Sequence, residues 1–513
     1  MNTFKRKALF TAMVAAVGAA GTAEAVYLNP NGTGQVLVYP YYTVQSANGN
    51  SWNTYISVVN TTGTAKAVKV RFLEGKTSSE VLDFNLFLSP NDVWTGAVIP
   101  ASSATGAPGH LITADNSCTS PAIGLTGVDF RNFQYAGGAG GSALPGTGLD
   151  RTREGYVEMI EMASLTGTTA TNITHVAGVP LNCSAVRGAT FTPPAGDMGS
   201  PTGGLMGTGT LINVNNGQDA GYKADALEAF SNIIQYTFPT STLPALDSPS
   251  PAVSLVVNAG TIIGAAPTGP ASMGITAYMS DYTTAATIPG ARAVATVFMH
   301  SAVLNEYVLD AATGSNTDWV ITQPLKNRFV SNTAAIAPYT ATLTASGACE
   351  TVAFSYFNRE EQGAAASGTD FSPIPPGASP NSICWESNVM SIRNGTGASA
   401  SLPTNASGVL GSVNNTNITV TSTFQNGWAS LVFTGTNATG VGLVAPAGTR
   451  VQLNQVSPPA PAIVAGAATY FGLPVTGFMI RNFANGSLTC GTATCQGNYG
   501  SLFNHSYRNT ITP

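Results

Sequence analysis

The feature that most constrains the fold is a strict alternation of apolar and polar residues along short segments near the N-terminus. In residues 68–72, Val, Val and Phe alternate with Lys69 and Arg71. Successive side chains of a β-strand point to opposite faces of a sheet, so this pattern predicts a strand with one apolar and one polar face. Residues 82–88 repeat the pattern, and a Ser-Pro-Asn-Asp turn follows them.

Short alternating strands joined by turns are typical of antiparallel sheets. We therefore expect a mainly β protein in which residues 26–188 form an immunoglobulin-like β-sandwich domain. A segment rich in Pro, Gly and Thr at 189–209 marks the first domain boundary. Residues 189–330 are expected to be mixed β structure with one or two short helices, and residues 331–513 a β-rich C-terminal domain.

The helices are expected in the middle domain. Residues 223–236 place Leu227, Phe230 and Ile234 at helical spacing, which predicts a short helix. Residues 291–306 fit a helix or a strand, and their length slightly favours the helix. The sequence contains no repeat of fixed period, which argues against a solenoid or propeller.

The N-terminus has the organisation of a secretory signal. Residues 5–7 are basic, residues 8–20 are apolar or small and uncharged, and residues 23–25 match an A-x-A cleavage site. We expect a signal peptide over residues 1–25. The apolar run is too short for a permanent membrane anchor, and no cysteine follows the cleavage site. The mature chain is therefore expected to be exported without a transmembrane helix, to the periplasm, the cell surface or the medium.

Charged residues are sparse. They make up 9% of the 513 residues, and the formal net charge is −5. The basic residues are scattered singly instead of forming a stripe, which argues against nucleic acid as a partner. The abundance of Gly, Thr and Asn suits strands and turns.

Six cysteines in an exported chain predict disulfide bonds, although six cysteines allow 15 connectivities. Sequential pairing is our preferred prediction because each bond would then close one local region. A rival interpretation places a metal ion between Cys490, Cys495 and His505, but structural zinc needs four ligands and no second cluster is visible. The predicted pairs are Cys118 with Cys183, Cys349 with Cys384, and Cys490 with Cys495.

Four short sequence motifs, taken together, distinguish this chain. They are YPYYT at 39–43, RFLEG at 71–75, LDFNLFLSPNDVW at 82–94 and FNREE at 357–361. In these motifs the chain resembles an uncharacterised family of exported β-rich proteins of Gram-negative bacteria. The resemblance implies export from a Gram-negative cell, and it implies no activity, so no functional residue carries over.

Carboxylates are the first candidates for catalysis. Glu154, Glu158 and Glu161 follow Arg151 and Arg153 in a predicted strand. A glycosidase needs two carboxyl groups roughly 5–9 Å apart. Glu154 and Glu158 share one face of a strand but lie about 13 Å apart at 3.3 Å per residue, and Glu161 points to the other face. We interpret the group as a solvated strand with Arg–Glu cross-strand pairs.

The other candidate motifs are weak. His110, His175, His300 and His505 have no zincin spacing, and no G-x-S-x-G elbow occurs. A Ser–His–Asp triad stays open because its members need not be close in sequence. Residues 215–219 lack the spacing of a calcium loop and are interpreted as a turn. The LPVTG letters at 473–477 lack the tail of a sorting signal and are interpreted as the start of a strand.

A group of aromatic residues is the candidate binding patch. Tyr39, Tyr41, Tyr42 and Trp52 would contact a sugar or a protein if exposed, although core packing is the favoured alternative. No residue is assigned a catalytic, cofactor-binding or metal-binding role.

The leading hypothesis is a non-enzymatic exported protein, secreted or surface-associated, with a structural, adhesive or binding role. Its candidate partners are a second copy of the chain and a cell-surface glycan or protein. The alternatives are a secreted hydrolase with carboxylates from separate strands, and an outer-membrane β-barrel. A pocket with two convergent carboxylates or a His–Ser pair would favour the hydrolase, and a flat surface with uncovered sheet edges would favour adhesion.

Overall fold

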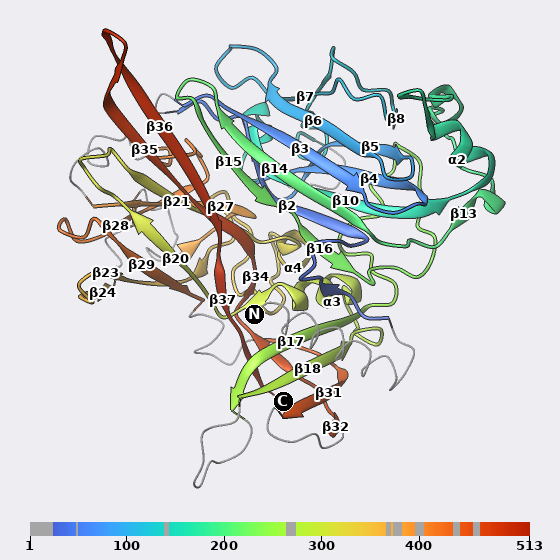
Figure 1. Ribbon diagram of the computed structural model, residues 1–513. Helices are drawn as coiled ribbons and strands as arrows, with labels where there is room; N and C mark the ends of the chain where they lie inside the picture. The colour runs from blue at the N-terminus through green and yellow to red at the C-terminus, as the bar shows by residue number, and fades with distance from the viewer. Residues whose placement is uncertain are drawn as a thin grey trace.

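The computed structural model describes residues 24–47, 50–137, 143–262, 273–365, 371–372, 382–394, 405–433, 442–454 and 462–512. Most of the predicted signal peptide, residues 1–23, lies outside the described residues. Antiparallel sheets dominate the described part, which confirms the mainly β fold class (Figure 1). Its α-helices are short: α2 (Gly167–Ile173), α3 (Pro289–Val297) and α4 (Lys326–Phe329). Three short 3-10 helices are η2 (Leu149–Arg153), η3 (Cys183–Val186) and η4 (Ala195–Asp197).

Two antiparallel sheets form the N-terminal sandwich. The strands of the first sheet are β1 (Tyr27–Leu28), β2 (Val36–Thr43), β4 (Ala65–Glu74), β5 (Glu80–Leu88), β8 (Cys118–Ser120), β10 (Glu154–Leu165), β13 (Met198–Gly199) and β16 (Asp225–Glu228). Those of the second are β3 (Trp52–Asn60), β6 (Val93–Pro100), β7 (Gly109–Ile112), β9 (Val128–Asp129), β14 (Leu205–Asn213) and β15 (Gln218–Lys223). The first sheet runs β1-β16-β2-β10-β4-β5-β8, with β13 beside β10, and the second runs β15-β14-β3-β6-β7-β9.

The apolar positions found in the sequence hold these two sheets together. Val70 and Phe84 of the first sheet share a core with Val58 and Trp94 of the second, and the Phe84 and Trp94 ring centroids lie 5.8 Å apart. In β3 the inward residues are buried and the outward ones are partly or fully exposed, as expected for a sheet with one solvent-facing side. The sandwich architecture is therefore present, and the immunoglobulin-like connectivity stays a prediction.

Strands from beyond residue 188 complete this sandwich. β14 pairs with β3 over its full length, and β16 pairs with β1 and β2. The segment 189–209 is thus a connection inside one sandwich. The helix predicted over 223–236 is wrong, because Leu227 pairs with Leu28 and Val36 as part of a strand. Sheet pairing across the chain overrides the local helical spacing.

The second half of the chain builds two larger sheets and one smaller one. One large sheet contains β21 (Asn316–Thr322), β25 (Phe371–Ser372), β27 (Ser387–Arg393), β28 (Asn415–Thr419), β35 (Thr476–Cys490) and β36 (Ala493–Asn504). The other contains β20 (Ala302–Val308), β23 (Ala353–Asn358), β24 (Gly363–Ala365), β29 (Asn426–Val432) and β37 (Ser506–Arg508). The smaller sheet, low in Figure 1, contains β17 (Val253–Ile262), β18 (Met273–Asp281), β31 (Ala447–Asn454) and β32 (Ala462–Ala465).

Short strands complete the fold. They are β11 (His175–Val176), β12 (Val179–Pro180), β19 (Met299–His300), β22 (Glu350–Thr351), β26 (Ser382–Ile383), β30 (Leu443–Val444), β33 (Thr469–Phe471), β34 (Leu473–Pro474) and β38 (Thr510–Thr512). The ambiguous segment 291–306 contains both structures, since α3 ends at Val297 and β20 begins at Ala302.

The two halves of the chain share one interior. β21 pairs with both β27 and β35, so the expected boundary after residue 330 also falls within a sheet. One face of this sheet packs Trp319 against Phe354 of the neighbouring sheet. Its other face carries Phe478, whose ring stacks on Tyr222 of the N-terminal sandwich with a centroid distance of 5.1 Å. Edge strand β36 lies along β15, where Asn498 Nδ2 donates to the Asn216 carbonyl at 2.8 Å.

The polar face of the first sheet is buried, in contrast to the predicted solvated strand. Every residue of β4 and of β10 is buried. The charged groups on this face form ion pairs across neighbouring strands: Lys69 with Asp83, and Arg71 with Glu80 and Glu158, both of the latter at 2.6 Å. Two further buried pairs, Lys66 with Glu161 at 2.8 Å and Arg151 with Glu74 at 2.7 Å, involve positions on the opposite face of the sheet, the one that carries Val68 and Phe72.

Later parts of the chain cover this charged face. The Lys69 ammonium donates to the Pro239 carbonyl at 3.1 Å, and the Leu246 amide donates to the Glu158 carboxylate at 3.3 Å. Burial raises the pKa of Glu158 even though Arg71 lies beside it. Burial also acts to raise the pKa of Glu74. The charge of Arg151 and the hydrogen bonds that Glu74 accepts together have a larger effect, so the pKa of Glu74 is lowered. The charged face is therefore an interior surface whose charges depend on their partners.

Removing the central cation should destabilise the whole fold. We expect Arg71→Met to lower the free energy of unfolding by about 3–5 kcal/mol, because it leaves Glu80 and Glu158 buried without their partner. The measurement is urea denaturation followed by circular dichroism. The matched control is Lys223→Met on exposed β15, with an expected change of about 0.5 kcal/mol or less. Equal effects of the two substitutions would show that the buried pairs contribute nothing.

Candidate functional site

The predicted aromatic patch is not on the surface. Tyr39, Tyr41 and Tyr42 are fully buried, and Trp52 is 2% exposed. Each polar tip has a partner inside the protein, as buried Tyr and Trp require. Tyr41 donates to the Glu154 carboxylate at 2.6 Å, and the Trp52 indole donates to a backbone carbonyl. These four residues therefore belong to the core, as the alternative interpretation held.

The three candidate carboxylates are held apart. Glu154 accepts from Tyr41 and from the amide of Val413, Glu158 pairs with Arg71, and Glu161 pairs with Lys66. The prediction that they line a solvated strand is wrong, because both faces of β10 are covered. Each carboxylate binds its own partner, so no two of the three form a catalytic pair.

Two of the four histidines are structural parts of the C-terminal half. His505 packs against Trp319 with ring centroids 5.3 Å apart and the rings tilted by 58°, and its Nε2 lies 3.0 Å from the Val320 carbonyl. A carbonyl only accepts, so Nε2 carries the proton and Nδ1 accepts from Asn305 at 3.0 Å. Burial lowers the pKa of His505 to about 3 and that of His300 to about 4.

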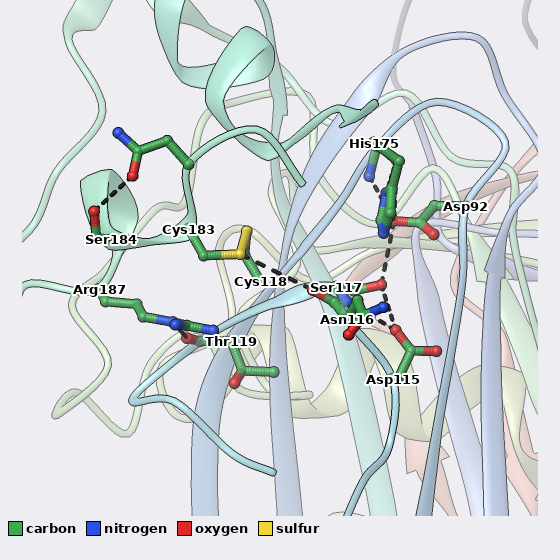
Figure 2. Close-up of a disulfide and its surroundings, with 12 residues drawn as sticks. Asp92, Asp115, Asn116, Ser117, Cys118, Thr119, His175, Cys183, Ser184 and Arg187 are labelled. Atoms are coloured by element: carbon green, nitrogen blue, oxygen red, sulfur yellow. Dashed lines mark hydrogen bonds and ion pairs between the residues drawn. A yellow bond between two sulfur atoms is a disulfide. The ribbon is translucent and has the colours of Figure 1, made fainter. Parts of the chain in front are cut away.

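A third histidine lies in a cluster beside the first disulfide. Figure 2 shows His175, Asp92, Ser117 and Asp115 next to the bond between Cys118 and its partner. Ser117 donates to Asp115 at 2.7 Å and lies 3.4 Å from Asp92. Among the described residues, this is the place where a histidine, a serine and an aspartate are joined by hydrogen bonds.

The geometry of this cluster differs from that of a catalytic triad. His175 Nδ1 lies 2.8 Å from Ser89 Oγ and 3.6 Å from Asp92, so one nitrogen faces both residues. A triad needs the two ring nitrogens to contact the serine and the aspartate separately. Asp92 also accepts from the Ser89 amide at 2.9 Å, which closes the turn before β6. The cluster therefore stabilises a turn.

All six cysteines form the predicted sequential disulfides. This pairing rules out Cys490 and Cys495 as metal ligands. Among the residues that the structure describes, no group of three His, Cys, Asp or Glu side chains could hold a metal ion. In the same residues no helix is long and apolar enough to span a membrane. The segments 215–219 and 473–477 form the predicted turn and strand start.

One exposed feature is a group of aromatic side chains on the two large C-terminal sheets. We call it the aromatic strip. The exposed fractions of Tyr499, Phe503 and Trp428 are 58%, 48% and 41%, against the usual burial of such side chains. Its residues are Phe357, Trp428, Phe483, Tyr499 and Phe503.

Strand register explains why the rings lie side by side within each sheet. Phe357 and Trp428 lie opposite each other in β23 and β29, and their rings stack with centroids 4.6 Å apart. Phe483 and Tyr499 lie opposite each other in β35 and β36. In Figure 1 the β35–β36 hairpin projects beyond its neighbouring strands, so its outer residues extend the strip away from the body.

Arg481 joins the two parts of the strip. Its guanidinium lies 5.4 Å from the ring centroid of Phe483 and 5.1 Å from that of Phe503. It also lies 3.5 Å from the carboxylate of Glu306, which is opposite Trp428 in the next sheet. The positive charge is thus compensated within the strip, and the strip presents flat rings with little net charge.

A polar hollow adjoins the stacked pair of rings. It has a volume of about 340 Å³ and is rich in amide side chains. Such side chains both donate and accept hydrogen bonds. The turn between β23 and β24 forms one of its walls, with Arg359 and Glu360. Its lining residues are Asn358, Arg359, Glu360, Gln362, Thr423, Gln425 and Asn426.

Sequence reasoning missed the strip because its members come from four strands spread over residues 353–504. Within β36, Tyr499 and Phe503 are four residues apart, which places them on one face of a strand. That spacing was the only local signal. Comparison with known proteins adds no assignment, since neither a protein family, nor a curated protein, nor a solved structure matches the chain.

Ser89, which contacts His175 and Asp92 beside the first disulfide, should have a structural role. We expect Ser89→Ala to lower the free energy of unfolding by about 1 kcal/mol, through loss of its hydrogen bonds to His175 and Asp92. The intact protein should not react with a fluorophosphonate probe for active serines, as read by mass spectrometry. Labelling of Ser89 would contradict this interpretation and favour a hydrolase.

The buried histidines predict a loss of stability in acid. His505 stays neutral in the folded protein down to about pH 3, whereas in the unfolded chain it takes up a proton below about pH 6.5. The contribution of neutral His505 to the free energy of unfolding is complete above about pH 6.5. It falls by about 1.4 kcal/mol for each pH unit below that value. Urea denaturation between pH 7 and pH 5 should show a shallower loss for His505→Gln than for wild type. If His505→Gln lost stability with pH as steeply as the wild type, buried His505 would not be the cause of the loss. The matched control is His175→Gln, because water reaches the His175 ring.

Proposed function

We propose that this chain is an exported, non-enzymatic binding protein that attaches to glycan through the aromatic strip. The observation that carries the proposal is the group of exposed rings on two sheets, linked by Arg481 and Glu306, beside an amide-lined hollow. Three disulfide bonds support a place outside the cytoplasm, where thiols are not kept reduced. The cell surface and the medium are the locations that suit this role.

The chemistry of sugars matches both parts of the surface. A pyranose ring presents C–H groups on its faces and hydroxyl groups around its edge. Exposed Trp428 and Tyr499 offer apolar ring faces for the C–H groups. Amide side chains such as Asn426 and Gln362 can donate to and accept from the hydroxyl groups. A long glycan would contact the strip and the hollow together.

Charge and shape favour a neutral glycan over a protein partner. The cation of the strip, Arg481, is already paired with Glu306, so the strip does not select a charged ligand. Binding hot spots between proteins are usually enclosed in well-packed pockets near the centre of an interface. The rings of the strip instead lie along an open sheet and its projecting hairpin.

Binding should depend on the exposed rings. We expect Trp428→Ala and Tyr499→Ala each to weaken binding by about tenfold or more, because each removes a platform for a sugar ring. The assay is depletion of the purified mature protein from solution by insoluble cellulose, chitin and peptidoglycan. Tyr55→Ala is the matched control, since Tyr55 is 48% exposed on the separate face of β3.

The outcomes separate the proposal from its alternatives. Binding to at least one glycan that both strip variants lose and the control retains supports it. Failure of the wild type to bind any of the three glycans would overturn it, as would equal binding by the strip variants. Release of reducing sugar from a bound glycan would overturn its non-enzymatic part.

A further inference from the structure

A second recess, which shares no lining residue with the strip, lies where the N-terminal sandwich meets the segment that follows β21. It has a volume of about 760 Å³, within the usual range of small-molecule sites. One wall is the turn between β4 and β5, residues 76–79, and another is α4 with the residues after it. The walls thus come from both halves of the chain, and we call this recess the junction pocket.

The junction pocket contains two ammonium groups that form no direct salt bridge with a described residue. Among the described residues, neither Lys76 nor Lys326 has a carboxylate oxygen within 4 Å, whereas Arg71 and Arg328 of the same walls are both paired. Lys326 is buried, donates to the Ala348 and Cys384 carbonyls at 2.7 and 3.1 Å, and lies over the Tyr339 ring. Lys76 is half-buried and lies over the Trp385 ring, so its ammonium group is the one that a ligand can reach.

A buried carboxyl group completes the base of the pocket. Glu386 is 3% exposed, lines the pocket, and its Oε2 atom has no hydrogen-bond partner. An unsatisfied buried polar atom costs about 1–3 kcal/mol, so it marks a place where a partner group fits. Burial raises the pKa of Glu386 to about 8 and lowers that of Lys326 to about 8. Arg71 and Arg328 are paired with carboxylates. Lys76 and Lys326, which form no salt bridge with the described residues, therefore outnumber the single carboxyl group of the lining, Glu386.

The remaining walls are rich in hydroxyl and amide groups and poor in apolar surface. Thr77, Ser79, Gln134, Asn327 and Ser331 contribute polar side chains. The disulfide between Cys349 and Cys384 holds in place the backbone carbonyl that Lys326 contacts. A ligand that fits this lining carries one negative charge and several hydroxyl groups.

We propose that the junction pocket binds a small anionic sugar of the hexuronic acid class. The ligand carboxylate pairs with Lys76 at the half-buried wall, and its hydroxyl groups bond to Lys326 and Glu386 at the base. This site is independent of the aromatic strip, which offers open rings to a neutral polymer. The protein would then recognise an acidic sugar and a neutral glycan at two separate places.

The test is isothermal titration calorimetry of the purified mature protein with D-glucuronate, D-glucose and acetate. We expect glucuronate to bind at least about tenfold more tightly than the other two. Absence of glucuronate binding at 10 mM, on the order of the weakest affinities measured this way, would overturn the proposal. Equal binding of acetate would overturn the sugar assignment, and equal binding of glucose would overturn the requirement for a negative charge.

Variants locate the site. Lys76→Gln should weaken glucuronate binding by about tenfold with an unchanged melting temperature, because Lys76 is half-buried and has no ion pair to lose. Lys223→Gln, a lysine on the outer edge of the N-terminal sandwich, should bind as the wild type does. Equal affinities for these two variants would overturn the assignment. Trp428→Ala should leave glucuronate binding intact, so failure of the glycan proposal and failure of this one can be told apart.

Discussion

The rest of the structure depends on the burial of a charged sheet face. The first sheet of the N-terminal sandwich has apolar side chains on one side and ion pairs centred on Arg71 on the other. Charges in a protein interior are tolerated only when they are paired and hydrogen-bonded. The later segment that contains Pro239 and Leu246 bonds to Lys69 and Glu158, so it both covers this face and satisfies its charged groups. The first sheet therefore needs the following chain to become stable.

This dependence explains why the two halves of the chain are not separate bodies. The Glu154 carboxylate accepts from the Val413 amide, and Phe478 stacks on Tyr222, so both polar and apolar contacts cross from one half to the other. The same junction leaves a recess in which Lys326 and Glu386 lie buried without a shared ion pair. A site of this kind arises because two sandwiches meet along surfaces that are not fully complementary.

The two candidate sites could be predicted from sequence to very different extents. Tyr499 and Phe503 share a strand, and their spacing alone places them on one face. Trp428 joins them only because β20 and β29 bring a second sheet alongside the hairpin. The junction pocket had no sequence signal, since Lys76 and Glu386 are more than 300 residues apart. Conversely, the densest aromatic run in the sequence, at 39–42, packs in the core, because β2 is a central strand covered on both faces.

By itself the sequence determined that the alternating segments near the N-terminus become strands, and it favoured sequential pairing of the cysteines. Alternation in 68–72 and 82–88 follows from the geometry of a single extended strand, and the three disulfides close local regions of the chain. Only the tertiary structure decided which sheet faces meet water. A polar stripe with Lys69 and Arg71 looks the same in sequence whether solvent or another layer covers it. The covering layer comes from residues far along the chain, and it decides which side chains remain available to a ligand.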